Sequence, residues 1–132
     1  MSLSILFVDD DADIRTIVSL SLSLDPAIDL RVAASGVEAL DAAAAGFVPD
    51  VAVLDVMMPG MDGLALLERL HAQPSTAQVP VIFMTAQARQ SDIATYLDRG
   101  AIGVITKPFD PIDLAPQVRA LLRAGQGSRS ST

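Results

Sequence analysis

The chain has 132 residues, about half of them hydrophobic, and its 16 acidic residues outnumber 9 basic ones to give a net charge of −7. This length fits one domain with its own core. The acidic balance argues against nucleic acid or an anionic membrane as a direct partner, because Lys and Arg lead binding to both. The absence of cysteine excludes a disulfide framework and a thiolate metal site. Neither a membrane span nor a signal peptide is indicated, so we expect a cytoplasmic protein.

Short apolar runs alternate along the chain with stretches of helical periodicity. The apolar runs predict five strands, in chain order residues 4–8, 28–33, 51–54, 79–84 and 101–105. The periodic stretches predict five helices, in chain order residues 14–22, 37–44, 64–70, 90–98 and 114–122. Alternation of this kind predicts a doubly wound α/β domain, in which helices cover both faces of a five-stranded parallel sheet.

The end of the chain holds two boundaries that the pattern helps to place. Pro116 would remove a hydrogen bond from a helix that began at Asp110, so we expect the last helix to begin near Asp113, with Pro116 in its first turn. The residues that follow Arg123 (AGQGSRSST) are small and polar. We therefore expect a folded domain over residues 1–123 and a disordered C-terminal tail over residues 124–132.

Polar side chains stand at the carboxyl ends of four predicted strands. They are Asp9, Asp10, Asp55, Thr85 and Lys107. Ligands of open parallel sheets bind at this edge, so we expect the five side chains to form one site. Carboxylates brought together repel one another, and a hard divalent cation relieves the repulsion. Because no His or Cys accompanies the carboxylates, the oxygen ligands predict a Mg²⁺ site.

Lys107 is the only lysine beside eight arginines, and it follows the last predicted strand. A compact ammonium suits one oxygen of a small anion better than a planar guanidinium does. Asp55 ends the central predicted strand, where a carboxylate can act as a nucleophile and form an aspartyl phosphate. The hydroxyl of Thr85 can donate a hydrogen bond to a phosphoryl oxygen. These residues together predict a magnesium-dependent phosphoryl site.

Four motifs in this order resemble the receiver domain of two-component response regulators, the CheY-like superfamily, over nearly the whole chain. They are ILFVDDD (5–11), LDVMMPGMDG (54–63), MTA (84–86) and TKPF (106–109). The resemblance implies a flavodoxin-like sheet in the order 2-1-3-4-5 and a cis bond between Lys107 and Pro108. It also implies a phosphoacceptor signalling domain that catalyses only its own phosphorylation and dephosphorylation.

The resemblance further implies a role for each site residue. Asp55 would accept a phosphoryl group from a phosphohistidine, carried by a sensor histidine kinase or a histidine phosphotransfer protein. Asp10 and Asp55 would bind Mg²⁺ through their carboxylates and Asp9 through a bound water. The backbone carbonyl of Met57 would be a further ligand. Two side chains would hold the phosphoryl group, Thr85 and Lys107.

The output would be a change in protein contacts, made by a stand-alone receiver that is a monomer or a weak phosphorylation-dependent dimer. The downstream target would be another protein, and the contact surface would lie within residues 90–123. One position departs from the family, because Val104 stands where an aromatic residue usually turns inward when the threonine moves toward the phosphate. The output must therefore be coupled to the site in another way.

Two alternatives remain open from the sequence. In a phosphatase of the haloacid dehalogenase type, Asp9 would be the nucleophile and Asp11 the acid, although a further acidic pair beyond the lysine is missing. The second alternative is a receiver-like interaction module that is never phosphorylated, and the presence of Val104 in place of the aromatic is its only support. The complete set of site residues argues against this second alternative.

Overall fold

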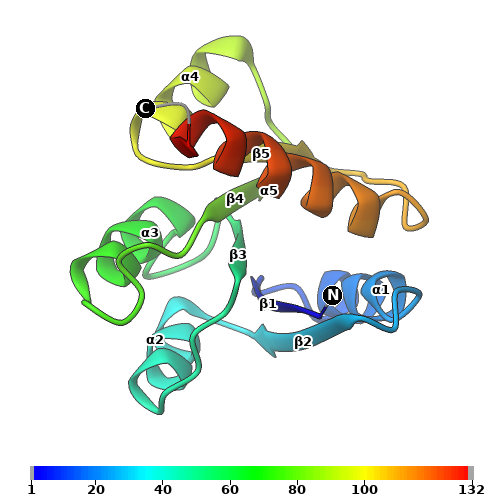
Figure 1. Cartoon of the computed structure of the whole chain (residues 1–132), viewed down its shortest axis with the longest axis horizontal. Helices are drawn as coiled ribbons and strands as arrows, with labels where there is room; N and C mark the ends of the chain where they lie inside the picture. Colours follow the sequence, from blue (N-terminus) through cyan, green and yellow to red (C-terminus); the bar gives the residue numbers. More distant parts are fainter. Residues whose placement is uncertain (1, 131–132) are drawn as a thin grey trace.

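The computed structural model describes residues 2–130, in which five strands alternate with five helices (Figure 1). The strands are β1 (Leu3–Val8), β2 (Ile28–Ala33), β3 (Val51–Asp55), β4 (Val81–Thr85) and β5 (Gly103–Thr106). The helices are α1 (Ala12–Leu22), α2 (Gly36–Ala44), α3 (Gly63–Ala72), α4 (Gln90–Asp98) and α5 (Leu114–Ser130). All ten predicted elements are present. Every predicted end lies within two residues of the observed one except the end of the last helix, which extends further.

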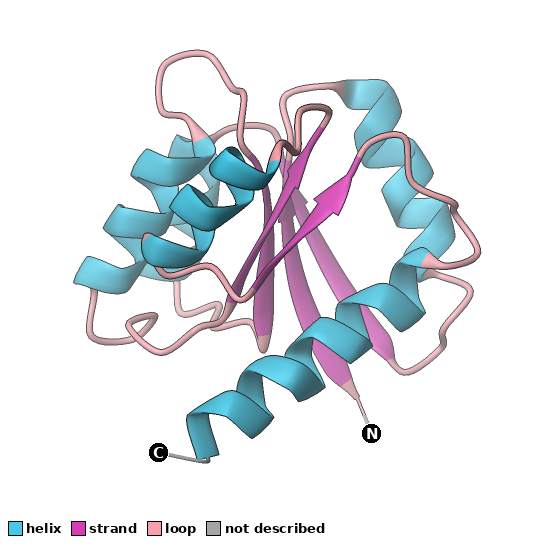
Figure 2. Cartoon of the chain, turned by 90° about the horizontal axis from the view of Figure 1, so that it is seen from above, coloured by secondary structure: helices cyan, strands magenta, loops and turns pink. Residues whose placement is uncertain are grey.

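The five strands form one parallel sheet in the order β2-β1-β3-β4-β5. Helices cover both of its faces (Figure 2). Side chains of α1 and α5 pack on one face, and side chains of α2, α3 and α4 pack on the other. The doubly wound α/β fold and the strand order expected from the sequence are therefore confirmed.

Burial on both faces follows from the alternation of side chains along each strand. In β1, Ile5 and Phe7 face the cluster that contains α1 and α5, while Leu6 and Val8 face the cluster that contains α2 and α3. All five residues of β3 are buried. Each fully buried Leu or Phe contributes about 1.5–3 kcal/mol to folding relative to an exposed one. The two clusters fix the sheet and thus the edge at which its strands end.

Short polar residues begin the helices nearest this edge. Asp11 is the N-cap of α1, and its carboxylate accepts hydrogen bonds from the backbone N–H groups of Asp13 and Ile14. Asp62 caps α3 in the same way, as its place in the PGMDG sequence predicts. The next residue, Gly63, lies so close to β3 that an added Cβ would collide with the backbone carbonyl oxygen of Asp55.

The last helix begins where Pro116 requires and continues further than the sequence indicates. Leu114 is its first residue, so Pro116 lies in the first turn, as predicted. The helix is described to Ser130 and thus covers most of the expected tail, whereas residues 131 and 132 lie outside the described residues. Gly125 packs on Ile102, since an added Cβ would meet the Ile102 side chain at 3.2 Å. This close approach places residue 125 of α5 against the segment just before β5.

Among residues 2–130, no helix combines the length and the apolar character that a bilayer crossing requires.

Candidate functional site

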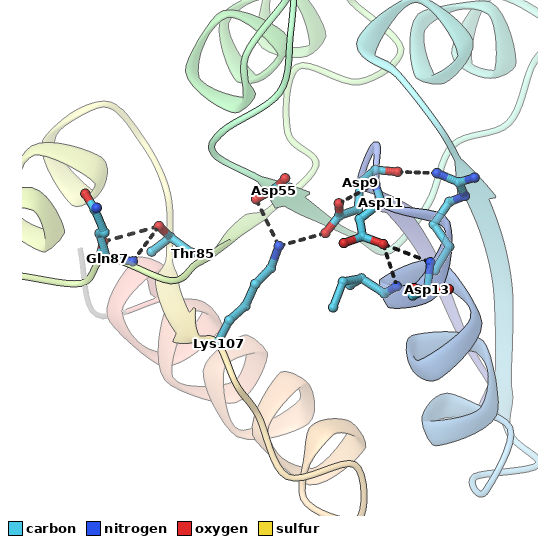
Figure 3. A network of polar contacts seen from close by, with 9 residues as sticks. Asp9, Asp11, Asp13, Asp55, Thr85, Gln87 and Lys107 are labelled. Carbon is cyan, nitrogen blue, oxygen red and sulfur yellow. Dashed lines mark hydrogen bonds and ion pairs between the residues drawn. The ribbon is translucent and has the colours of Figure 1, made fainter.

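The strand ends bring the predicted site residues to one edge of the sheet. Asp9 directly follows β1, Asp55 ends β3, Thr85 ends β4 and Lys107 directly follows β5. Figure 3 shows Asp9, Asp55 and Lys107 pointing toward one another. The residues border a cavity of about 290 Å³, whose lining is Asp9, Asp10, Asp11, Asp55, Met57, Thr85, Ala86, Gln87 and Lys107. The cavity is therefore lined by all six residues to which the resemblance assigns a role in the site, Asp9, Asp10, Asp55, Met57, Thr85 and Lys107.

Lys107 links the two buried carboxylates of the site. Its Nζ lies 2.9 Å from Asp9 Oδ2 and 3.2 Å from Asp55 Oδ1 (Figure 3). Asp9 is 0 % exposed and Asp55 5 %, so water screens their charges less than it would at the surface. The peptide bond between Lys107 and Pro108 is cis, as the resemblance implies.

Two further contacts hold Asp9 in place. Its second carboxylate oxygen, Oδ1, accepts a hydrogen bond of 2.9 Å from the backbone N–H of Asp11. Its backbone carbonyl accepts a hydrogen bond of 2.8 Å from Nη1 of Arg15, one turn into α1. The sequence analysis missed Arg15, because no motif marks a side chain that binds a backbone atom. Its position one helical turn after the acidic cluster was the available signal.

The charges of the site have opposite effects on the pKa of Asp55, and burial is the largest influence on it. Burial, followed by the nearby charge of Asp9, raises the pKa of Asp55 from 3.8 to about 6, while Lys107 works in the opposite direction. For Lys107, burial alone would lower the pKa. The hydrogen bonds and charges of Asp9 and Asp55 outweigh burial, and the pKa of Lys107 is raised. The lysine is therefore a fixed positive charge, whereas Asp55 holds its negative charge weakly.

Three carboxylates could hold a divalent cation. Asp9, Asp10 and Asp55 each offer one oxygen, and these oxygens lie within 4.8 Å of one another. Asp10 is exposed to solvent, so a cation could enter from its side of the cavity. The donors are all oxygen atoms, as Mg²⁺ prefers, and the raised pKa of Asp55 reflects a site short of positive charge. The residues present therefore fit this metal.

Thr85 lies at the cavity but its hydroxyl does not reach toward Asp55. Its Oγ1 accepts a hydrogen bond of 3.1 Å from the backbone N–H of Gln87 and donates one of 3.2 Å to the backbone carbonyl of Gln87. In Figure 3 this pair of contacts lies apart from the group formed by Asp9, Asp55 and Lys107. Thr85 therefore lies at the end of β4, as predicted. The contact of its hydroxyl with the loop after β4 could not be predicted from the sequence.

The position of Asp11 bears on the phosphatase alternative. Its Oδ1 is engaged in capping α1, with distances of 2.9 Å to the N–H of Asp13 and 3.4 Å to that of Ile14. These two contacts direct the carboxylate toward the first turn of α1. Asp11 therefore caps α1, and the structure gives no support to its role as the general acid of a phosphatase.

The arrangement has the features of a phosphoacceptor site on a flavodoxin-like sheet. In agreement, residues 5–119 match the family described as response regulator receiver domain, and the chain belongs to this family. It is therefore a receiver domain of two-component signal transduction, a phosphoacceptor signalling domain rather than an enzyme in the usual sense.

Two similar regulators are longer than this chain. The DNA-binding dual master transcriptional regulator RpaA of Synechocystis sp. is 38 % identical over 119 residues, which cover 90 % of this chain and 48 % of RpaA. Response regulator PleD of Caulobacter vibrioides is 40 % identical over 124 residues, which cover 93 % of this chain and 27 % of PleD. The chain thus spans about half or less of the length of these curated relatives.

A solved structure agrees with the fold. The chemotaxis response regulator CheY4 of Vibrio cholerae is 30 % identical to this chain and superposes with a TM-score of 0.82. The superposition covers 92 % of this chain and 99 % of that one. Nearly the whole described fold is therefore that of a CheY-like receiver.

Proposed function

We propose that Asp55 accepts a phosphoryl group from a phosphohistidine and that the chain signals through the resulting change in its protein contacts. The observation that carries this proposal is the placement of the Asp55 carboxylate, which lies at an open cavity with a lysine ammonium 3.2 Å away and the acidic pair Asp9 and Asp10 beside it. The donor is a sensor histidine kinase or a histidine phosphotransfer protein.

Asp55 performs the chemical step. One carboxylate oxygen attacks the phosphorus of the phosphohistidine, a P–O bond forms and the P–N bond breaks. The electron pair of the broken bond stays on the leaving imidazole nitrogen, which takes up a proton from water. Because the pKa of Asp55 is raised only to about 6, the carboxylate is ionised at pH 7 and above and available for attack.

Two further residues bind the transferred group. The Lys107 ammonium, now shared between Asp9 and Asp55, gains a phosphoryl oxygen as a partner when Asp55 is modified. The Thr85 hydroxyl rotates away from Gln87 and donates a hydrogen bond to another phosphoryl oxygen. Neither Met57 nor Gln87, at the mouth of the cavity, offers an acid or a base that would activate water against the phosphoryl group.

The proposed metal is Mg²⁺, held by carboxylate oxygens of Asp10 and Asp55, by Asp9 through a bound water and by the backbone carbonyl of Met57. When bound, Mg²⁺ supplies the positive charge that offsets the negative charge of the phosphoryl oxygens. The oxygen-only donor set and the crowded carboxylates support this assignment.

The proposed output partner is a protein, and its contact surface lies within residues 90–123. We propose a cytoplasmic monomer, or a weak dimer that forms on phosphorylation. In either case the signal depends on Asp55, so its chemistry is the first point to test.

The test is the intact mass of the protein after incubation with Mg²⁺ and acetyl phosphate, a small donor that needs no kinase. We expect one added phosphoryl group in the wild type, and none without Mg²⁺ or in Asp55→Asn. The matched control is Asp98→Asn, which neutralises an exposed aspartate at the end of α4 and should be labelled like the wild type. Labelling of Asp55→Asn, or a wild type that stays unlabelled with acetyl phosphate and with a phosphohistidine donor, would contradict the proposal.

A further inference from the structure

We propose that Tyr96 of α4, rather than a residue of β5, is the aromatic side chain that couples the state of Asp55 to the position of α4. This inference rests on the proposed phosphorylation of Asp55. It identifies Tyr96 as a positioning residue, which acts through its packing and does not touch the phosphoryl group.

Tyr96 lies against the part of the sheet where the aromatic residue of β5 is absent. Val104 of β5 pairs in register with Phe83 of β4, so their side chains are neighbours on the same face. The Tyr96 ring meets the Phe83 ring edge-on, with centroids 5.3 Å apart and planes at 61°. Tyr96 and Val104 both pack on the core cluster of this face. An aromatic ring thus packs on Phe83, the strand neighbour of Val104, but it comes from the helix.

The ring contact matters because little else attaches α4 to the domain. None of the residues of α4 is buried, whereas each of the other four helices buries at least three. Its N-cap residue, Arg89, makes no side-chain capping hydrogen bond. Tyr96 is half-buried and packs on the core cluster of this face, so its ring is an important attachment of α4. A helix held by so few contacts can change position at low cost.

Thr85 connects the phosphoryl site to this helix. Its hydroxyl is bound to both backbone groups of Gln87, three residues before α4 begins. Thr85 and Phe83 are two residues apart in β4 and point to the same face of the sheet. When the hydroxyl turns to a phosphoryl oxygen, both bonds to Gln87 are lost, and the loop over residues 86–89 is released together with the start of α4.

The released helix can then bring its ring further inward. Rotation of Thr85 leaves space on the face that carries Phe83, and the small side chain of Val104 does not fill it. An apolar surface without neighbours loses packing energy, so the Tyr96 ring moves into the space and α4 follows.

The Tyr96 hydroxyl does not fix the ring. It makes no hydrogen bond to another side chain or backbone group of the described residues. Burial, followed by the charge of Asp92, raises the pKa of Tyr96, so the phenol remains neutral at physiological pH. The positioning role therefore belongs to the ring, and phenylalanine should replace it.

The sequence provides a direct probe, because Tyr96 is the only tyrosine and tryptophan is absent. Tyrosine emission therefore reports on this one ring. With Mg²⁺ and beryllium fluoride as a phosphoryl mimic, we expect the Stern–Volmer constant for acrylamide quenching to fall in the wild type and to stay constant in Asp55→Asn. The intact mass after treatment with acetyl phosphate is recorded in parallel.

Amide hydrogen exchange of three variants separates positioning from mere stability. In the wild type and in Tyr96→Phe, beryllium fluoride should change exchange in both the 86–89 loop and α4. In Tyr96→Leu the change should stop at the loop, although acetyl phosphate still labels Asp55. The matched control is Leu97→Ala, which truncates an exposed apolar residue next to Tyr96 and should behave like the wild type.

Two results would overturn the inference. If Asp55 is labelled while quenching of Tyr96 and exchange in α4 stay unchanged, Tyr96 is not the coupling residue and the proposed function stands. An unlabelled wild type that also fails to respond to beryllium fluoride removes the proposed function and this inference with it.

Discussion

Asp55 carries the charge that the folded protein tolerates least. Its carboxylate lies beside that of Asp9, the residue is only 5 % exposed, and its pKa is raised from 3.8 to about 6 by burial first and by Asp9 second. The folded protein thus holds a proton on Asp55 more tightly than the unfolded chain does. The contribution of Asp55 to the free energy of unfolding is therefore fully present below about pH 4 and is lost as the pH rises through 6. Above that range the folded protein has lost the whole contribution. A poorly stabilised carboxylate at this position agrees with the nucleophilic role proposed for Asp55.

Replacing this carboxylate with a neutral isostere should stabilise the metal-free protein. A pKa raised from 3.8 to about 6 corresponds to a loss of roughly 3 kcal/mol above pH 6. Water in the open cavity screens part of it, so we expect Asp55→Asn to gain about 1–2 kcal/mol at pH 7.5. Urea unfolding in the presence of EDTA measures this difference. Near pH 4 the two proteins should be equally stable, and a gain that persists there would contradict the electrostatic origin.

At the scale of whole elements, hydrophobic periodicity is sufficient to predict the sheet and its helices. The differences lie at ends where a backbone contact intervenes. The pattern predicts β5 from residue 101, but the strand begins at Gly103, because the N–H of Ala101 is bound to the carbonyl of Tyr96 at the end of α4. It predicts β4 from residue 79, but the strand begins at Val81, after Pro80, which has no N–H to donate. Hydrophobic periodicity reports which side chains are apolar and not which backbone groups join the sheet.

The site could be predicted as a set of residues but not as a set of contacts. Strand ends identified Asp9, Asp55, Thr85 and Lys107, since the topology alone brings them to one edge. The sequence could not show that the Thr85 hydroxyl is bound to Gln87, because a rotamer depends on the loop that surrounds it. For the same reason, the sequence could not indicate which residue couples the site to α4.

The junction between β3 and α3 gives a prediction at this scale. Gly63 and Gly36 each begin a helix, and at both positions an added Cβ would lie within 3 Å of a neighbouring atom. At Gly63 the neighbour is the backbone of Asp55, which cannot move without moving the Asp55 carboxylate. At Gly36 it is the Met61 side chain, 2.7 Å away at its sulfur, which can rotate aside.

We therefore expect Gly63→Ala to cost about 1–3 kcal/mol of stability and Gly36→Ala distinctly less. Only the first should also slow the labelling of Asp55 by acetyl phosphate, because it displaces the backbone that carries the carboxylate. Thermal unfolding and labelling rates measure the two effects. Equal costs for the two variants, or normal labelling of Gly63→Ala, would show that the close approach to Asp55 is unimportant.

For the molecule as a whole, two separate clusters on the two faces of the sheet leave its carboxyl edge free for polar groups. This division lets a protein with a net charge of −7 place three carboxylates in one cavity without weakening its core. The proposed cation would relieve the repulsion within that cavity and would bind only the folded state, because the unfolded chain does not bring together residues 9 and 55. Metal binding is thereby linked to global stability.

Mg²⁺ should accordingly raise the melting temperature of the whole domain. A ligand at about 100 times its dissociation constant stabilises a protein by about 2.7 kcal/mol if it binds the folded state alone. We expect the melting temperature of the wild type to rise with Mg²⁺ concentration, and that of Asp10→Asn, which removes an exposed ligand, to rise much less. Asp98→Asn, which removes the same charge far from the site, controls for general screening of the acidic surface. If the two variants respond alike, the effect of Mg²⁺ is screening and the cavity is not its binding site.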